Sequence, residues 1–230
     1  MDTSLIKLIE VRKSYGSNEV LKGLEANFEK GFVYGIAGHN GAGKTTLFRC
    51  IAGLESCKGE VATSLKPVRN YLGYLSTNPM FINKMTGREY LQLFLHARGL
   101  EINDLDDRNI FGLPLDEYAS NYSTGMKKKL ALMSILIQQN QVYILDEPFN
   151  GVDIQSNMLI IEIIKQLKNL GKLVLISSHI FSTLETVCDE IYLLKGGRFV
   201  TQVDKTGFSE LEQEMKDFSI TDQVAKLNIR

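Results

Sequence analysis

The residues from Gly38 to Thr46 read Gly-His-Asn-Gly-Ala-Gly-Lys-Thr-Thr, an unbroken G-x-x-x-x-G-K-[ST] pattern. In such a loop, backbone N–H groups surround a nucleotide's phosphates, the lysine reaches the outer phosphates and the threonine hydroxyl faces Mg²⁺. Glycine is needed at positions 41 and 43, because a Cβ would block close backbone approach or a positive φ. The pattern predicts a phosphate site made of Gly38, His39, Asn40, Gly41, Ala42, Gly43, Lys44, Thr45 and Thr46.

The flanking residues supply the context that this pattern requires. Phe32 to Ala37 is a short apolar run, typical of a strand buried on both faces. Thr45 to Ala52 reads as a helix, which Gly53 ends in the left-handed conformation. A helix N-terminus directly after the loop adds attraction for anions. The alternative, a glycine-rich turn that binds nothing, is the weaker interpretation.

Length, charge and cysteine usage limit the remaining possibilities. A chain of 230 residues can form one α/β unit or two small domains, and a net charge of -1 provides no basic field for nucleic acid. No apolar run approaches the ~18 residues of a membrane span, and the N-terminus does not read as a signal peptide. The 3 cysteines form no C-x-x-C pair, so metal and disulfide roles are poorly supported. We therefore expect a soluble, cytoplasmic protein.

Hydrophobic periodicity predicts how the chain is organised. Residues 4–30 read as antiparallel strands with a turn near Gly16. Thr86 and Glu89 form a capping box, and the segment 81–138 reads as predominantly helical. Two apolar runs around a helix, at Val142–Leu145 and Leu173–Ile176, are typical of a parallel sheet. We expect an α/β core at 1–80 and 139–205, an N-terminal antiparallel β subdomain, an inserted helical subdomain at 81–138 and a polar C-terminal tail at 206–230.

Two acidic residues follow the first of these apolar runs, in the sequence Asp146-Glu147-Pro148. Ligands of open α/β sheets lie beyond the carboxyl ends of the strands, so both acids are expected to face the phosphates. Asp146 suits Mg²⁺ ligation alongside Thr45. Glu147 can orient and deprotonate a water that attacks the γ-phosphate. Two solvated carboxylates in a loop are the less favoured alternative behind a buried strand.

A run of lysines follows a helix cap. Ser123 is a good N-cap, and Lys127, Lys128 and Lys129 lie in the first turn that it begins. Positive charge there opposes the helix dipole, which a docked anion would make tolerable. The alternative is an exposed lysine run, and the residues alone leave the two explanations nearly even.

Taken together, these motifs resemble the ATP-binding cassette of ABC transporters over essentially the whole chain. The resemblance adds the signature Tyr122–Met126, the D-loop Asn150–Asp153 and the switch histidine His179, in family order and spacing. It implies a P-loop NTPase core and Mg-dependent ATP hydrolysis, with Lys44, Glu147 and His179 as catalytic residues. His179 is then a γ-phosphate contact, Tyr15 is the aromatic residue that stacks on adenine, and Asp153 joins the nucleotide-binding set.

The resemblance also implies a mechanism that one chain cannot complete. Ser123 and the amide of Gly125 would contact the ATP held by a second ATP-binding subunit, in a head-to-tail homo- or heterodimer with two ATPs at its interface. On this view an anion accounts for the lysine run. ATP hydrolysis would drive transport through a separate membrane-spanning permease subunit. This chain would lie peripherally on the inner face of the cell membrane.

Two positions depart from the family pattern. Thr77 stands where a glutamine usually contacts Mg²⁺ and relays to the membrane subunit. A threonine hydroxyl can ligate Mg²⁺, which gives Thr45, Asp146 and Thr77 as metal ligands. Its side chain is too short to span as glutamine does. The alternative is that Asn78 substitutes through a register shift. The signature ends in Met126 rather than glutamine, which resembles export-type systems.

The leading hypothesis is therefore the ATP-hydrolysing subunit of a membrane exporter. A soluble ABC ATPase that acts as a switch on nucleic acid or the ribosome is the alternative, and the charge gives no reason to expect a nucleic-acid partner. Thr77 motivates a third hypothesis, a nucleotide-binding module with little hydrolysis. A small-molecule phosphotransferase would leave Ser123, Gly125 and His179 without a purpose. The transported substance is not encoded in these residues.

Overall fold

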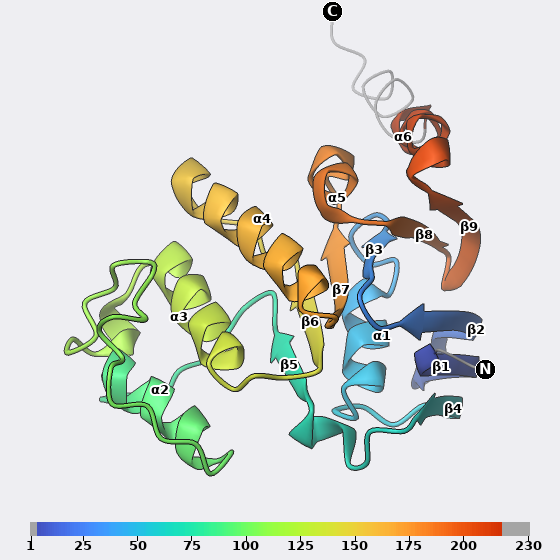
Figure 1. Cartoon of the computed structure of the whole chain (residues 1–230). Coiled ribbons are helices and arrows are strands. Elements are labelled where there is room, and N and C mark those ends of the chain that lie inside the picture. Colours follow the sequence, from blue (N-terminus) through green and yellow to red (C-terminus); the bar gives the residue numbers. More distant parts are fainter. Residues whose placement is uncertain (1–3, 218–230) are drawn as a thin grey trace, which may run out of the picture.

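The computed structural model describes residues 4–217, and the main feature of this part of the chain is a six-stranded sheet in the order β5-β6-β7-β3-β8-β9 (Figure 1). Neighbouring strands from β5 to β8 run parallel, and β9 is antiparallel to β8. The predicted crossover is confirmed, because α4 (Ile154–Asn169) connects β6 to β7. The strands are β3 (Val33–Ala37), β5 (Leu72–Leu75), β6 (Val142–Asp146), β7 (Leu173–Ser178), β8 (Glu190–Lys195) and β9 (Arg198–Asp204).

A second sheet confirms the antiparallel subdomain predicted at the N-terminus. Its three strands lie in the order β2-β1-β4. They are β1 (Ser4–Tyr15), β2 (Asn18–Glu29) and β4 (Lys58–Thr63), and both pairings are antiparallel. Helix α1 (Lys44–Ile51) lies between the two sheets in Figure 1, and Phe48 on this helix is fully buried in the core that they share.

The main sheet is covered on both faces, which explains why its central strands are apolar throughout. Along β3, Tyr34 and Ile36 point into the core formed with α1 and the antiparallel sheet. Val33 and Ala37 point into the opposite core, which includes residues of α3 (Thr124–Leu136), α4 and α5 (Phe181–Val187). This packing fixes the carboxyl end of β3, from which the glycine-rich loop begins.

The segment 81–138 is helical only towards its two ends. Helix α2 (Gly87–His96) begins at the predicted capping box of Thr86 and Glu89, and α3 begins at the predicted cap Ser123. Residues 97–118 contain turns but no helix, and a short 3-10 helix, Ala119–Asn121, follows. Leu105, Leu113 and Leu115 in this stretch are nevertheless buried. Their burial accounts for the apolar pattern without a helix.

The last described elements lie at the edge of the main sheet. A 3-10 helix, Lys205–Gly207, leads into α6 (Phe208–Asp217), whose Phe208 ring packs edge-on against Phe181 at a centroid distance of 6.1 Å. Residues 218–230 of the expected tail lie outside the described residues. A further 3-10 helix, Val68–Asn70, precedes β5. No helix within residues 4–217 is both long enough and apolar enough to span a bilayer.

Candidate nucleotide-binding site

The glycine-rich loop joins β3 to α1 at the carboxyl end of the parallel sheet. Gly41 and Gly43 have φ values of 84° and 109°, so the predicted need for positive φ is met at both positions. Gly38 is needed for a different reason, since a Cβ there would lie 2.4 Å from the carbonyl oxygen of Leu194 in β8. The loop is thus seated directly against a neighbouring strand.

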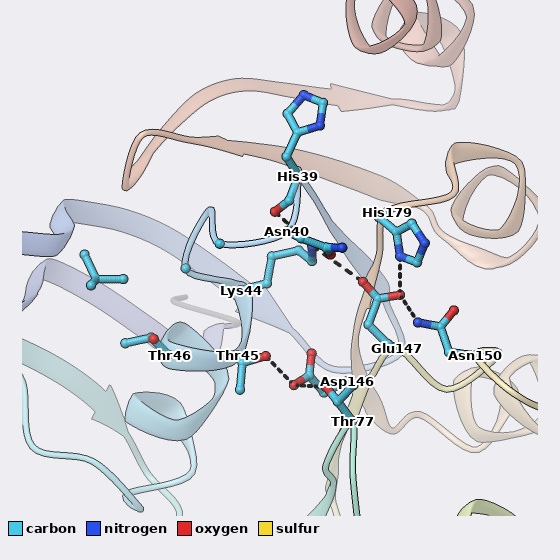
Figure 2. Close-up of a pocket in the computed structure, with 13 residues that line it drawn as sticks. His39, Asn40, Lys44, Thr45, Thr46, Thr77, Asp146, Glu147, Asn150 and His179 are labelled. Carbon is cyan, nitrogen blue, oxygen red and sulfur yellow. Dashed lines mark hydrogen bonds and ion pairs between the residues drawn. The ribbon is translucent and has the colours of Figure 1, made fainter. Parts of the chain in front are cut away.

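A cavity of about 460 Å³ opens beside this loop (Figure 2). It brings together residues from the loop, from the ends of β5, β6 and β7, and from β2. They are Val20, His39, Asn40, Gly41, Gly43, Lys44, Thr45, Thr46, Thr77, Asp146, Glu147, Asn150 and His179. Several parts of the sequence that were predicted to meet at the phosphates therefore do meet around one cavity.

Lys44 is buried, and its ammonium group faces the loop and the acids. Its Nζ donates hydrogen bonds to the carbonyl oxygens of Gly38 at 2.7 Å and His39 at 3.3 Å. The same atom lies 3.5 Å from Glu147 Oε1. A cation held at this position, beside loop amides and a helix N-terminus, is suited to binding a phosphate.

Asp146 is fully buried and accepts three hydroxyl hydrogen bonds. Thr45 and Thr77 donate to its Oδ2 at 2.7 and 2.8 Å, and Ser177 donates to its Oδ1 at 2.6 Å. The two threonine hydroxyls and the carboxylate form a set of hard oxygen ligands, which Mg²⁺ prefers. Within residues 4–217 no three His, Cys, Asp or Glu side chains gather as a metal site.

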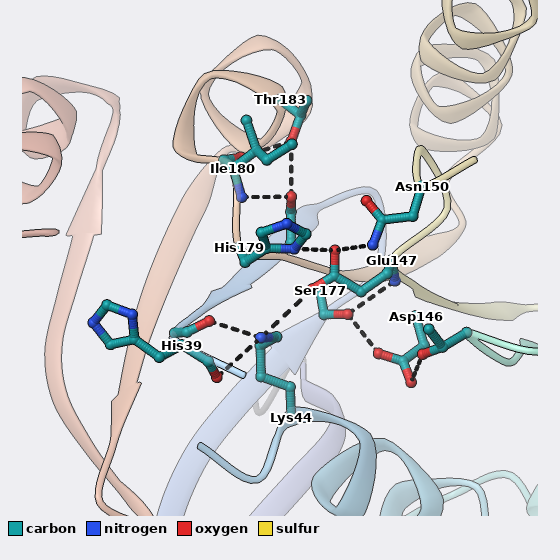
Figure 3. A network of polar contacts seen from close by, with 12 residues as sticks. His39, Lys44, Asp146, Glu147, Asn150, Ser177, His179, Ile180 and Thr183 are labelled. Carbon is teal, nitrogen blue, oxygen red and sulfur yellow. Dashed lines mark hydrogen bonds and ion pairs between the residues drawn. The ribbon is translucent and has the colours of Figure 1, made fainter. Parts of the chain in front are cut away.

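Glu147 has an unusual backbone conformation, with a φ of 52°. Its N–H donates to Ser177 Oγ at 3.0 Å (Figure 3). Its Oε2 accepts from Asn150 Nδ2 at 3.3 Å and lies 3.0 Å from His179 Nδ1. No group among residues 4–217 donates a hydrogen bond to the buried Oε1. Strained backbone of this kind persists where surrounding contacts impose it, and it clusters at functional sites.

Three residues of this arrangement were absent from the predicted site. Ser177 links Asp146 to the Glu147 backbone, and the hydroxyls of Ser177-Ser178 at the end of an apolar strand are a signal that could have identified it. Asn150 was assigned only to the D-loop, although its amide contacts the Glu147 carboxylate. Val20 lines the cavity from β2, and no local sequence signal marks it.

The cavity does not include the remaining predicted ligands. Ser123 is exposed and its Oγ accepts from the N–H of Met126 at 3.2 Å, as a helix cap. Asp153 caps α4 in the same way, and the ring of Tyr15 lies outside the cavity with 45% of the residue exposed. The residues predicted as ligands that do not line this cavity are Tyr15, Gly38, Ala42, Ser123, Gly125 and Asp153.

The anion explanation of the lysine run is wrong for two of its lysines. Lys128 is buried and donates to the carbonyl oxygens of Glu147 and Asn150 at 2.7 and 2.9 Å. Lys129 donates to Asp153 Oδ2 at 2.9 Å and to Ser156 Oγ at 3.0 Å. The N–H of Ser156 and the Lys129 ammonium hold the pKa of Asp153 well below its usual range. The ammonium groups of Lys128 and Lys129 at the start of α3 therefore donate their hydrogen bonds to acceptors of the same chain.

Comparison with known proteins agrees with this geometry. Residues 21–150 match the ABC transporter family. The chain is 30% identical to the ABC-type transporter ATP-binding protein EcsA of Bacillus subtilis, over 97% of this chain and 96% of that protein. It is 34% identical to the ABC transporter ATP-binding protein NatA of the same organism, over 79% of this chain and 80% of that protein.

A solved structure described as the ATP binding subunit of an ABC transporter has the same fold. It superposes with a TM-score of 0.81 at 26% identity, covering 93% of this chain and 100% of that one. The chain therefore belongs to the ABC transporter family, as an ATP-binding and ATP-hydrolysing subunit.

Proposed function

We propose that residues 1–230 act as one ATP-binding domain that hydrolyses MgATP in the cavity beside residues 38–46 and thereby powers a separate membrane-spanning permease. The observation that carries this proposal is the Glu147 carboxylate, which is held by His179 and Asn150 while its Oε1 lies 3.5 Å from Lys44 Nζ. A base and a phosphate-binding cation at this separation suit the attack of water on a γ-phosphate.

Each residue has a defined part in this reaction. Lys44 and the loop amides hold the outer phosphates, Glu147 accepts a proton from the attacking water, and His179 orients the Glu147 carboxylate. Thr45, Asp146 and Thr77 supply oxygens that fit Mg²⁺, which when bound neutralises developing charge on the phosphates. The 2.7 and 2.8 Å hydrogen bonds from both threonines to Asp146 support this fit.

A second ATP-binding subunit completes the proposed site. Ser123 is exposed at the start of α3 and lies outside the cavity of its own chain. A partner chain can present the same residue, together with Gly125 and Asp153, to the nucleotide held here. Tyr15, exposed at the end of β1, is the proposed adenine contact.

We place the chain in the cytoplasm, at the inner face of the cell membrane, bound to its permease. Relatives named as ATP-binding proteins of transporters support this placement. Met126 in the signature supports an export-type system. The transported substance is set by the permease and not by this chain.

The substitution Glu147→Gln tests the proposal. It keeps the size of the side chain but removes the base, so ATP binds while phosphate release falls by roughly 10²–10⁴-fold. The variant should then accumulate as a dimer, seen by size-exclusion chromatography with MgATP. Lys44→Ala is the matched control, because it should lose ATP binding itself. A Glu147→Gln protein that stays monomeric would count against the two-chain site.

A further inference from the structure

Lys128 is a buried lysine whose ammonium group serves a different element. Only 2% of the residue is exposed, and its Nζ donates to the carbonyl oxygens of Glu147 at 2.7 Å and Asn150 at 2.9 Å. Lys128 lies in the first turns of α3, whereas both acceptors lie in the turn between β6 and α4. One side chain thus ties a helix of the 81–138 segment to the turn that carries the proposed base.

This turn needs external support at Glu147. Its φ of 52° is a conformation that residues other than glycine seldom adopt. The N–H of Glu147 donates to Ser177 in β7 (Figure 3). Its carbonyl oxygen accepts from Lys128 at 2.7 Å and from the N–H of Asn150 at 3.3 Å. The peptide groups on both sides of Glu147 are therefore anchored, one from β7 and one from α3.

The chemistry of a buried ammonium favours a positioning role over a stabilising one. Burial lowers the pKa of Lys128, while the nearby charges of Glu147 and Asp146 raise it. A buried charge is costly unless it is compensated by hydrogen bonds, and the hydrogen bonds of Lys128 go to the turn that carries Glu147. The two hydrogen bonds of Lys128 hold the backbone of Glu147 and Asn150 in position, which explains a lysine at this place.

We propose that Lys128 is a positioning residue for hydrolysis, which holds the backbone of Glu147 and Asn150 so that the Glu147 carboxylate is aimed at the attacking water. This inference rests on the proposed role of Glu147 as the base. The side-chain amide of Asn150 contacts the same carboxylate at 3.3 Å. The two carbonyl groups that Lys128 holds therefore belong to the residue that carries the carboxylate and to a residue that contacts it. Lys128 itself does not contact the substrate.

Three substitutions test this role. Lys128→Met keeps the length of the stem but has no donor, whereas Lys128→Gln keeps an amide donor on a shorter stem. A misplacement of ~1 Å at a reacting group can cost about 100-fold in rate, so we expect Lys128→Met to lower kcat by roughly 10- to 100-fold. The KM for ATP and the Kd of a fluorescent ATP analogue should change by less than about twofold. Lys128→Gln should fall between, and Lys165→Met, on the exposed face of α4, should match the unaltered protein.

A double-mutant comparison separates positioning from a general structural effect. Because Lys128 acts through the Glu147 carboxylate, Lys128→Met should change the residual single-turnover rate of Glu147→Gln by less than about twofold. An unchanged kcat in Lys128→Met, or an equal fold-loss in both backgrounds, overturns the inference. Should Lys128→Met fail to fold, Lys128→Gln in both backgrounds makes the same comparison. Unimpaired hydrolysis by Glu147→Gln alone would instead remove the base, and with it the proposed function.

Discussion

Thr77 lines the cavity and contacts the buried carboxylate of Asp146. Its hydroxyl donates to Asp146 Oδ2 at 2.8 Å, beside the equivalent bond from Thr45. A hydroxyl at this distance is placed to share a cation with the carboxylate, and its shortness compared with glutamine does not remove it from the site. The consequence of Thr77 for magnesium binding therefore becomes a prediction that substitution can test.

We expect Thr77→Val, which removes only the hydroxyl, to raise the Mg²⁺ concentration needed for half-maximal ATPase activity. If the lost oxygen contact to the cation is comparable to a hydrogen bond to a charged group, about 1.5–3 kcal/mol, that concentration should rise at least roughly tenfold. Magnesium titration of phosphate release measures the effect. Thr186→Val, which removes a hydroxyl from the exposed face of α5, is the control. An unaltered magnesium requirement would exclude Thr77 from the metal site.

Single residues also show how far the sequence alone could lead. Lys44 and Asp146 were predictable because phosphate and Mg²⁺ chemistry demands those residue types at that spacing. Ser177 and Lys128 were not, since their partners lie 31 and 19 positions away and are set by strand pairing and by helix packing. The positive φ of Glu147 likewise depends on anchors from two other elements.

At the scale of elements, one arginine on α2 forms ion pairs with two aspartates of the loop 97–118. Arg88 on α2 pairs with Asp106 at 2.9 Å and with Asp116 at 2.7 Å. These contacts lower the pKa of both aspartates from an ordinary value of 3.8. Ion pairs across 18 and 28 positions leave no local pattern, which is why the sequence indicated helix where the chain forms turns.

Because the folded-state pKa values of the two aspartates are lowered, their contribution to stability is complete above the ordinary pKa and is lost as pH falls through the folded-state values. Arg88→Met should therefore show a smaller loss of protection in residues 97–118 when the pH is lowered from about 5 to about 2. Hydrogen exchange followed by mass spectrometry measures this. Arg108→Met, which breaks an exposed pair with Asp104, is the control. Equal acid sensitivity with and without Arg88 would refute the prediction.

For the whole molecule, the proposed two-chain site predicts complementation between defective chains. In a dimer of a Lys44→Ala chain with a Ser123→Arg chain, one site carries both defects and the other carries neither. Mixing the two inactive proteins should therefore produce ATPase activity that neither has alone, provided that the chain pairs with its own kind. The control is one chain carrying both substitutions, mixed with the unaltered chain. No gain of phosphate release in the first mixture would contradict a shared site of two identical chains.

The order of strands in the main sheet has a consequence for how this protein is made. The glycine-rich loop begins at β3, and β3 lies between β7 and β8, which come much later in the chain. Gly38 also abuts the carbonyl oxygen of Leu194. The ribosome must therefore synthesise the chain through β8 before both strands that flank β3 and its loop are present. A nascent chain cannot capture nucleotide until most of its length has been synthesised.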